Sequence, residues 1–188
     1  MNIETNPERV KELATQKEDE NWDFRTFLKV IDLSTEELDA IVHRHHNEVS
    51  QHIDCCACGN CCKTLLPDLS PDDMERLAGT LSLSRDDLIE QYLTCGEEKD
   101  QHTFKSTPCP LLSGNRCTVY DARPDACRSY PHLHKKGFVH RLIGVVENAT
   151  ICPIVFNVFE RLKEDLWDPW GHTWMDEEWA GQPDSFDE

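Results

Sequence analysis

The chain has 188 residues, with 19 basic and 36 acidic side chains, a formal charge of −17 and ten cysteines. This length suits one folded domain, and so acidic a surface excludes nucleic acid and anionic membranes as expected partners because both would repel it. The sequence shows no run of about 20 apolar residues, and its first residues lack the basic and apolar regions of a secretory signal. We therefore expect a cytoplasmic protein, in which clustered cysteines bind metal or do redox chemistry more often than they form disulfides.

Residues 1–54 are expected to form an acidic helical N-terminal flank with a charge of −7. Residues 7–17 are a short polar helix candidate. Residues 34–37, Ser-Thr-Glu-Glu, form a capping box that predicts the start of a second helix. Leu38, Val42 and Val49 lie on one stripe of that helix. The histidines at positions 43, 45 and 46 do not share one face, and we interpret them as surface or boundary residues.

Residues 55–153 contain all ten cysteines and are expected to form the metal-binding domain. Ser70 with a following proline, and Ser84 with Asp87, predict the starts of two helices that form a hairpin. Residues 113–115, Ser-Gly-Asn, are typical of a turn. Residues 138–146 resemble a strand that contains one glycine, so the predicted strands are few and short.

Residues 154–188 are expected to form a C-terminal helix and an acidic tail, with a charge of −8. Pro153 is a suitable first residue for that helix, and the apolar side chains after it follow a helical period. The tail contains four tryptophans, between positions 167 and 179. We expect the tail to pack on the core, and the alternative is a docking segment for a protein partner.

Residues 55–62 read Cys-Cys-Ala-Cys-Gly-Asn-Cys-Cys and contain the pattern C-x2-C-x2-C-C. Two residues between cysteines allow a tight turn to direct both sulfurs at one ion, and Gly59 can supply the positive φ that such a turn needs. Four more cysteines follow at separated positions. The candidate metal ligands are Cys55, Cys58, Cys61, Cys62, Cys109, Cys117, Cys127 and Cys152.

Positive charge accompanies the later cysteines, because residues 101–141 carry a local charge of +5. Four thiolates around a divalent ion leave a net charge of −2, which nearby cations stabilise. Tyr120, Arg123, Arg128 and Tyr130 lie beside candidate ligands and could donate hydrogen bonds to sulfur. The alternative is that the tyrosines pack the core and Arg123 caps a turn.

At these residues the sequence resembles the YkgJ-like cysteine cluster family, also described as the CxxCxxCC zinc- or iron-chelating domain. The resemblance covers residues 53–153 and includes the pattern C-x2-Y-x2-R-P-x2-C-R-x-Y-P that begins at Cys117, and the late Cys152-Pro153. It implies metal chelation. Flagellin lysine N-methylases are relatives within this family, although they are longer chains. Cys56 and Cys95 fall outside the pattern and are interpreted as spare thiols.

Eight candidate ligands exceed the four that a tetrahedral zinc ion requires. Two mononuclear sites, one site with spare thiols and a multinuclear cluster all fit that count. Neighbouring Cys61 and Cys62 are expected to face different sites, or one of them binds metal and the other packs. His132 and His134 are reserve ligands. Thiolate chemistry fits a zinc or iron ion, and a [4Fe–4S] cluster is the alternative.

The sequence thus predicts an α+β, cysteine-rich single domain that is mostly helical with a few short strands and is organised around thiolate-bound metal. The predicted function is metal chelation. The alternatives are an iron–sulfur redox protein or enzyme distantly similar to flagellin lysine N-methylase, and a thiol redox sensor. We identify no catalytic constellation apart from the metal site, which leaves an enzymatic role undecided and disfavoured.

Overall fold

The computed structural model describes residues 3–96 and 101–167, which form ten α-helices, two 3-10 helices and five short strands. The α-helices are α1 (Pro7–Gln16), α2 (Glu18–Leu28), α3 (Thr35–Ser50), α4 (Cys55–Cys58), α5 (Asn60–Thr64), α6 (Pro71–Leu81), α7 (Arg85–Tyr92), α8 (Asp125–Ser129), α9 (Leu142–Ala149) and α10 (Pro153–Leu166). The 3-10 helices are η1 (Tyr120–Ala122) and η2 (Phe138–Arg141). The strands are β1 (Asp68–Leu69), β2 (Leu93–Cys95), β3 (His102–Phe104), β4 (Leu112–Ser113) and β5 (Arg116–Cys117).

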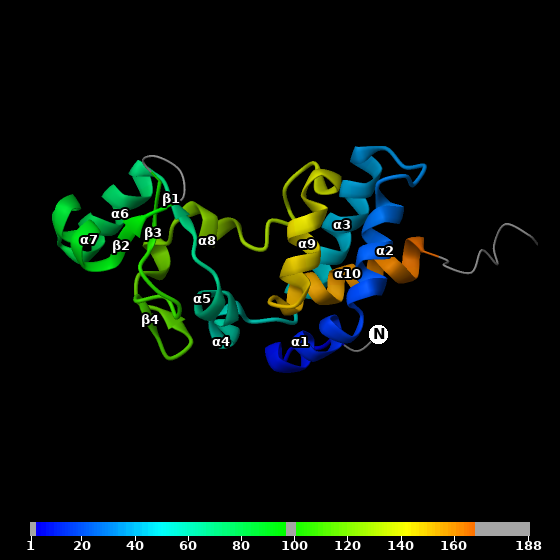
Figure 1. The fold of residues 1–188 in the computed structure, drawn as a ribbon, viewed down its shortest axis with the longest axis horizontal. Helices are drawn as coiled ribbons and strands as arrows, with labels where there is room; N and C mark the ends of the chain where they lie inside the picture. Colours follow the sequence, from blue (N-terminus) through cyan, green and yellow to red (C-terminus); the bar gives the residue numbers. More distant parts are fainter. Residues whose placement is uncertain (1–2, 97–100, 168–188) are drawn as a thin grey trace, which may run out of the picture.

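Helices α1, α2, α3, α9 and α10 form one lobe of the molecule, called here the helical lobe (Figure 1). Its core contains fully buried Phe24, Val42, Phe159 and Leu162. The Phe24 ring meets the Phe159 ring edge-on with the centroids 5.1 Å apart. Apolar residues at a helical period on α3 and α10 build this core, so the two terminal flanks of the chain fold together.

Helices α6 and α7 pack against a three-stranded antiparallel sheet of order β1-β3-β2 and form a second, smaller lobe (Figure 1). Its core includes Met74, Leu77, Leu88 and Phe104, all buried. The predicted hairpin of α6 and α7 is confirmed, because the two helices contact each other directly.

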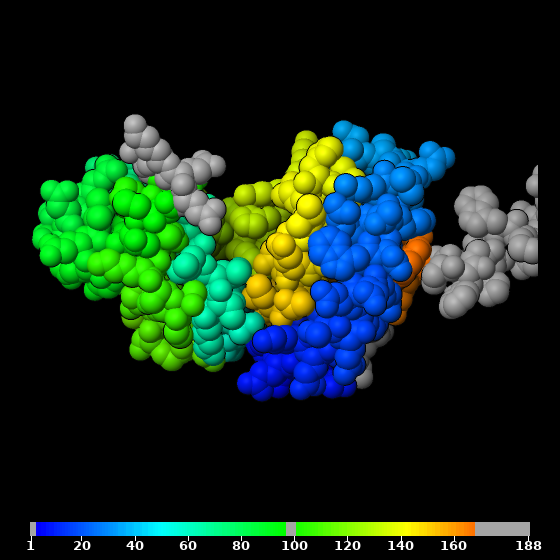
Figure 2. Space-filling model, in the orientation of Figure 1, coloured from blue at the N-terminus to red at the C-terminus, as the bar shows by residue number. Residues whose placement is uncertain are grey.

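The segments that carry the opening cysteine motif and Cys127 lie between the two lobes. Helices α4 and α5 and helix α8 occupy this middle part, and the hairpin of β4 and β5 borders it (Figure 1). The space-filling view shows α4 and α5 wedged between the smaller lobe and the C-terminal helices (Figure 2). Neither α4 nor α5 contains a buried residue. The middle segments therefore have little apolar core of their own.

Most of the predicted helix starts are confirmed. The side chains of Ser34 and Ser70 each accept a hydrogen bond from the third residue of the helix in a complete capping box. Ser84 caps α7, and Pro153 is the first residue of α10. Helices α2 and α8 were not predicted. The mostly helical single domain with few short strands is confirmed.

The strand predicted for residues 138–146 is wrong, because these residues form η2 and most of α9. The buried carboxylate of Asp39 accepts hydrogen bonds from the backbone N–H groups of Gly137 and Phe138, at 2.7 and 2.8 Å. This anchor ties the start of the segment to α3. Packing of buried Val145 and Val146 in the helical lobe then outweighs the strand propensity of valine.

Of the tryptophan-rich tail, only Trp167 belongs to the described residues, and its ring lies 5.3 Å from that of Phe24. The prediction for the other tail tryptophans concerns positions outside the described residues. In the part of the chain that the structure describes, no single helix is long and apolar enough to cross a membrane. Residues 138–149 and α10 meet that length and composition requirement only as a pair bent by 119°.

Candidate metal centre

The opening cysteine motif folds into two short helices that meet at Gly59. Gly59 has φ +59°, as its place between two cysteine pairs predicts, and a Cβ there would lie 2.9 Å from the carbonyl oxygen of Asn115. The side chain of Asn115 donates to the carbonyl of Ala57, and that of Asn60 donates to the carbonyl of Ile151, each at 2.7 Å. These amides fasten the motif to the β4–β5 hairpin and to the segment that precedes α10.

Four thiols from three segments form one group, called set A, which comprises Cys55, Cys58, Cys61 and Cys152. All four line a hollow of about 30 Å³ between the motif and the start of α10. The pKa of Cys152 is raised to about 12, chiefly by burial and also by the neighbouring thiols Cys55 and Cys58. The pKa of Cys61 is also raised, first by its hydrogen bond with Cys62 and then by burial and Cys152. Set A is therefore a group of neighbouring thiols that runs from exposed Cys55 to buried Cys152.

The other four candidate ligands form a second group, called set B, which comprises Cys62, Cys109, Cys117 and Cys127. Burial raises the pKa of Cys127 to about 12, and Cys62, Cys109 and Cys117 contribute to that rise. The pKa of Cys109 is likewise raised to about 11, chiefly by burial and also by Cys62 and Cys117. The backbone N–H of Cys109 donates to the carbonyl of Cys62 at 2.7 Å, which brings the later segment against the motif.

Neighbouring Cys61 and Cys62 lie in different sets and touch each other. The hydrogen bond between their thiols lowers the pKa of Cys62 to about 6, and the positive charges of Arg123 and Lys63 assist. The two sets therefore meet at this pair.

Backbone N–H groups donate to several of the sulfurs. Those of Ile154 and Val155, in the first turn of α10, donate to Cys152. The N–H of Leu111 donates to Cys109, and that of Val119 donates to Cys117. Hydrogen bonds of this kind favour the ionised form of a thiol, which is the form that binds metal. The donor set and its backbone environment thus fit a thiolate-bound ion.

The four residues expected beside the ligands have different surroundings. Arg123 lies near both sets: its charge helps to lower the pKa of Cys62 and limits the rise at Cys55 and Cys117. Its guanidinium carbon stacks 3.4 Å above the Tyr120 ring. The Tyr120 hydroxyl bonds with spare Cys56. Arg128 donates to the backbone carbonyls of Arg123 and Asp121. Arg123 is therefore the cation that faces the thiols, whereas Arg128 supports the loop.

Tyr130 lies beside set A. Its pKa is raised strongly, first by burial and then by Cys152 and Cys61, so the hydroxyl stays protonated. This hydroxyl donates to Oδ1 of Asn148 at 2.9 Å and also lies within hydrogen-bond contact of Cys152. Asn148 carries no signal in the sequence that would associate it with the cysteines.

The spare thiols and the histidines occupy separate places. Cys56 lies near Cys55 of set A and Cys117 of set B, whereas Cys95 is exposed on β2. His45 is buried and bonds with Asp165, so it is a boundary residue of α3 and α10. The rings of His46 and reserve ligand His134 lie 6.2 Å apart, and the ring of reserve ligand His132 lies 5.9 Å from that of Tyr130.

Asp73, the acid of the Ser70 capping box, also holds the loop that leads to Cys127. Its buried carboxylate accepts the backbone N–H of Asp125 at 3.0 Å and pairs with Arg76, which donates to the carbonyl of Arg123. Burial would raise the pKa of Asp73, but hydrogen bonds from Ser70 and Asp125 and the charge of Arg76 hold it below its ordinary value.

We expect Asp73→Ala to lower the free energy of unfolding by about 2 kcal/mol, because it removes a helix cap and leaves buried donors unpaired. It should also weaken metal binding by set B, since the loop before Cys127 is released. Urea unfolding and competition with a colorimetric chelator measure the two effects. Asp72→Ala is the matched control, an exposed acid in the same turn. Equal effects of both variants would contradict this role.

The raised thiol pKa values predict that the metal-free, reduced protein loses stability at alkaline pH. Cys109, Cys127 and Cys152 ionise at about pH 9 in the unfolded chain, but only at about 11 to 12 in the folded one. Above pH 9 the folded state therefore binds more protons, and the free energy of unfolding falls as pH rises. The lowered pKa of Cys62 acts in the opposite direction between about pH 6 and 9.

Urea midpoints of metal-free and metal-loaded protein between pH 7 and 11 test this dependence. Lysine and tyrosine titrate in both samples, so the loaded protein is the control, and its midpoint should fall less because its thiolates already bind metal. Parallel curves would contradict the expectation.

The candidate ligands do not have the geometry of a metal-bound site. Across residues 3–96 and 101–167, no three His, Cys, Asp or Glu side chains share the close geometry of a formed metal site. The eight thiols lie near one another as two sets, and a metal ion would have to gather each set.

Comparison with known proteins gives one result. The model of the CxxCxxCC family, described as a "putative zinc- or iron-chelating domain", matches residues 54–152, which is more than half of the chain. Neither the curated proteins nor the solved structures contain a significant match. The matched region contains every thiol of sets A and B, and it confirms the resemblance noted in the sequence. The chain therefore belongs to the CxxCxxCC family of zinc- or iron-chelating domains.

Proposed function

We propose that this protein chelates two metal ions of the zinc or iron class, one with the four thiols of set A and one with the four thiols of set B. The observation that carries the proposal is the separation of the eight pattern cysteines into two groups of four, with Cys61 in one and Cys62 in the other. Four thiolates are the complete ligand set of a closed tetrahedral site.

Closed four-thiolate sites leave no position for a substrate, so the proposed chelation is structural or serves metal storage. Each divalent ion with four thiolates would carry a net charge of −2. Arg123 and Lys63 lie near set B and offset part of that charge, and the backbone N–H groups at the start of α10 do so for Cys152 of set A. The two sets thus have separate means of stabilising thiolates.

The number of metals per chain tests the proposal. We expect anaerobically purified protein to contain two metal ions, and Cys58→Ser and Cys127→Ser to contain one each, because they remove a ligand from set A and set B respectively. Elemental analysis measures the content. Cys95→Ser is the matched control and should keep two ions, since Cys95 is exposed and belongs to neither set.

The same samples discriminate between the proposed metals. Zinc leaves the protein colourless, whereas thiolate-bound iron and [4Fe–4S] clusters absorb visible light, and only the clusters release inorganic sulfide with acid. One ion per chain that is lost in both serine variants would contradict two separate sites. Four irons with equivalent sulfide would replace the proposal with an iron–sulfur protein.

One observation favours a thiol redox sensor as a second candidate. Cys62 has a pKa lowered to about 6 by its contact with Cys61, and a thiolate in contact with a second thiol is prone to oxidation. Mass spectrometry after mild oxidation of the metal-loaded protein tests this candidate. Reversible loss of alkylation at Cys61 and Cys62 would support it, and full alkylation after oxidation would remove it.

A further inference from the structure

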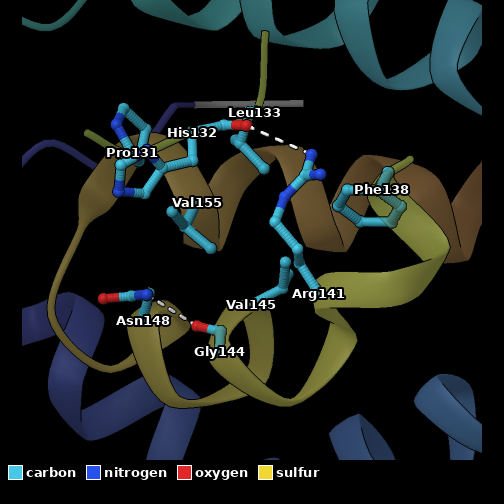
Figure 3. Close-up of a pocket in the computed structure, with 9 residues that line it drawn as sticks. All are labelled: Pro131, His132, Leu133, Phe138, Arg141, Gly144, Val145, Asn148 and Val155. Carbon is cyan, nitrogen blue, oxygen red and sulfur yellow. Dashed lines mark hydrogen bonds between the residues drawn. The ribbon is translucent and has the colours of Figure 1, made fainter. Parts of the chain in front are cut away.

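A cavity of about 310 Å³ lies in the helical lobe, between α9 and the loop that follows Pro131 (Figure 3). Its walls are mainly apolar and include Leu133, Phe138, Val145 and Val155. A cavity of about 150 Å³ with apolar walls can hold benzene, so this one has room for an aromatic ring with a substituent. None of the thiols of sets A and B lines it.

Gly144, in the middle of α9, lines one side of this cavity (Figure 3). Glycine weakens a helix interior relative to alanine, and nothing about this position requires glycine sterically. A Cβ there would meet only the side-chain nitrogen of Asn148, at 4.0 Å. The missing side chain therefore leaves free volume in the cavity at a cost to the helix.

Positive charge is concentrated at the rim, where Arg141 lies across from His132 (Figure 3). The guanidinium of Arg141 donates to four backbone carbonyls, those of His132, Lys135, Lys136 and Gly137. These bonds use its NH1 and NH2 groups and leave the Nε–H donor. Among the described residues no carboxylate forms an ion pair with Arg141, so its charge is not neutralised.

His132 adds a second polar group. Its Nδ1 is buried without a hydrogen-bond partner in the described part of the chain, and its backbone has φ +65°, which is uncommon for a residue other than glycine. Burial and the positive charge of Lys135 hold its pKa below the ordinary value. The nearby carboxylate of Asp39 is engaged by the N–H groups of Gly137 and Phe138. The cavity thus combines apolar walls with an unbalanced positive rim.

We propose that this cavity binds a small organic monocarboxylate with a compact apolar body, of about the size of benzoate. The apolar body fills the space above Gly144, and the carboxylate lies at the rim between Arg141 and His132. Arg141 has no carboxylate partner among the described residues, and a bound carboxylate would supply one.

The cavity lies close to set A. Asn148, which lines the cavity, accepts the hydrogen bond of the Tyr130 hydroxyl, and that hydroxyl also contacts Cys152. A bound carboxylate would therefore be separated from set A by Tyr130 and Asn148. The ligand site extends the proposed metal chelation but does not depend on it, because no thiol contributes to the cavity.

Titration of the metal-loaded full chain with benzoate, followed by ligand-detected NMR, tests the proposal. We expect benzoate to bind at least tenfold more tightly than benzyl alcohol, which has the same ring but no charge. Gly144→Ala should weaken benzoate binding, and Gly144→Leu should weaken it at least tenfold by filling the cavity. Metal content measured on the same samples shows whether the chelating sites remain intact.

Gly79→Leu is the matched control, because Gly79 is an exposed glycine inside α6 with no atom within 4 Å of its Cβ position. It should improve helix propensity as Gly144→Leu does and leave benzoate binding unchanged. The site would be overturned if the unmodified chain did not bind benzoate, or if the Gly144 variants bound it as tightly as the unmodified chain. Equal affinity for benzyl alcohol would overturn the assignment of a carboxylate.

Discussion

Removal of metal with a strong chelator is expected to abolish amide protection in residues 54–64 and 123–131, and to leave α3, α9 and α10 protected. The middle segments depend on their thiols because α4 and α5 contain no buried residue. A structural zinc site contributes roughly 10–16 kcal/mol of binding free energy, far more than these short helices can obtain from apolar contacts. The helical lobe has its own core around Phe24 and Phe159, which no metal supports.

Hydrogen exchange with mass spectrometry, on loaded and chelator-treated protein under reducing conditions, measures this difference peptide by peptide. Peptides of α6 and α7 serve as an internal comparison, since they belong to the apolar core of the smaller lobe, which includes Met74 and Leu88. Readdition of metal should restore protection in the middle segments. Unchanged exchange in residues 54–64, or uniform loss across α3 and α10, would contradict a metal-organised middle joined to a self-supporting helical lobe.

Lys163→Met is expected to lower the free energy of unfolding by about 3–5 kcal/mol. The ammonium group of Lys163 is buried and donates to Glu20, Asn21 and Glu160, at 2.7, 2.6 and 2.7 Å. Methionine preserves much of the volume but leaves the nearly buried carboxylate of Glu160 without this partner. Among the described residues, Glu160 would then keep only its ion pair with Lys17, the residue between α1 and α2.

Urea unfolding of metal-loaded variants measures this loss. Arg161→Met is the matched control, because Arg161 lies on α10 like Lys163 but pairs with the largely exposed Glu48 of α3, and surface pairs contribute less than about 1 kcal/mol. The double variant of Lys163→Met with Glu160→Gln should regain part of the loss, since it removes the uncompensated charge as well. Equal effects of Lys163→Met and Arg161→Met would show that the buried charge network is not critical.

Local signals in the sequence were sufficient for most helix starts. Ser34 and Ser70 each have an acid three residues later, and Pro153 precedes a run of apolar residues at a helical period, so short-range bonding alone defined these ends. The strand predicted for residues 138–146 was wrong because its β-branched residues are equally suited to a buried helix. The anchor at Asp39 is distant in sequence and could not be seen.

By itself, the sequence was sufficient to predict metal chelation by thiolates. The spacing of the cysteines, Gly59 at a positive φ and the match to the zinc- or iron-chelating family all follow from residue order, because ligand spacing in a tight turn is a local property. Only the tertiary structure divided the thiols into two sets. Adjacent Cys61 and Cys62 are equivalent in the pattern, and contacts with Cys152 on one side and Cys109 on the other distinguish them. Those contacts join segments about 50 to 90 residues apart, so chain packing and not local spacing decides which sulfurs can share an ion.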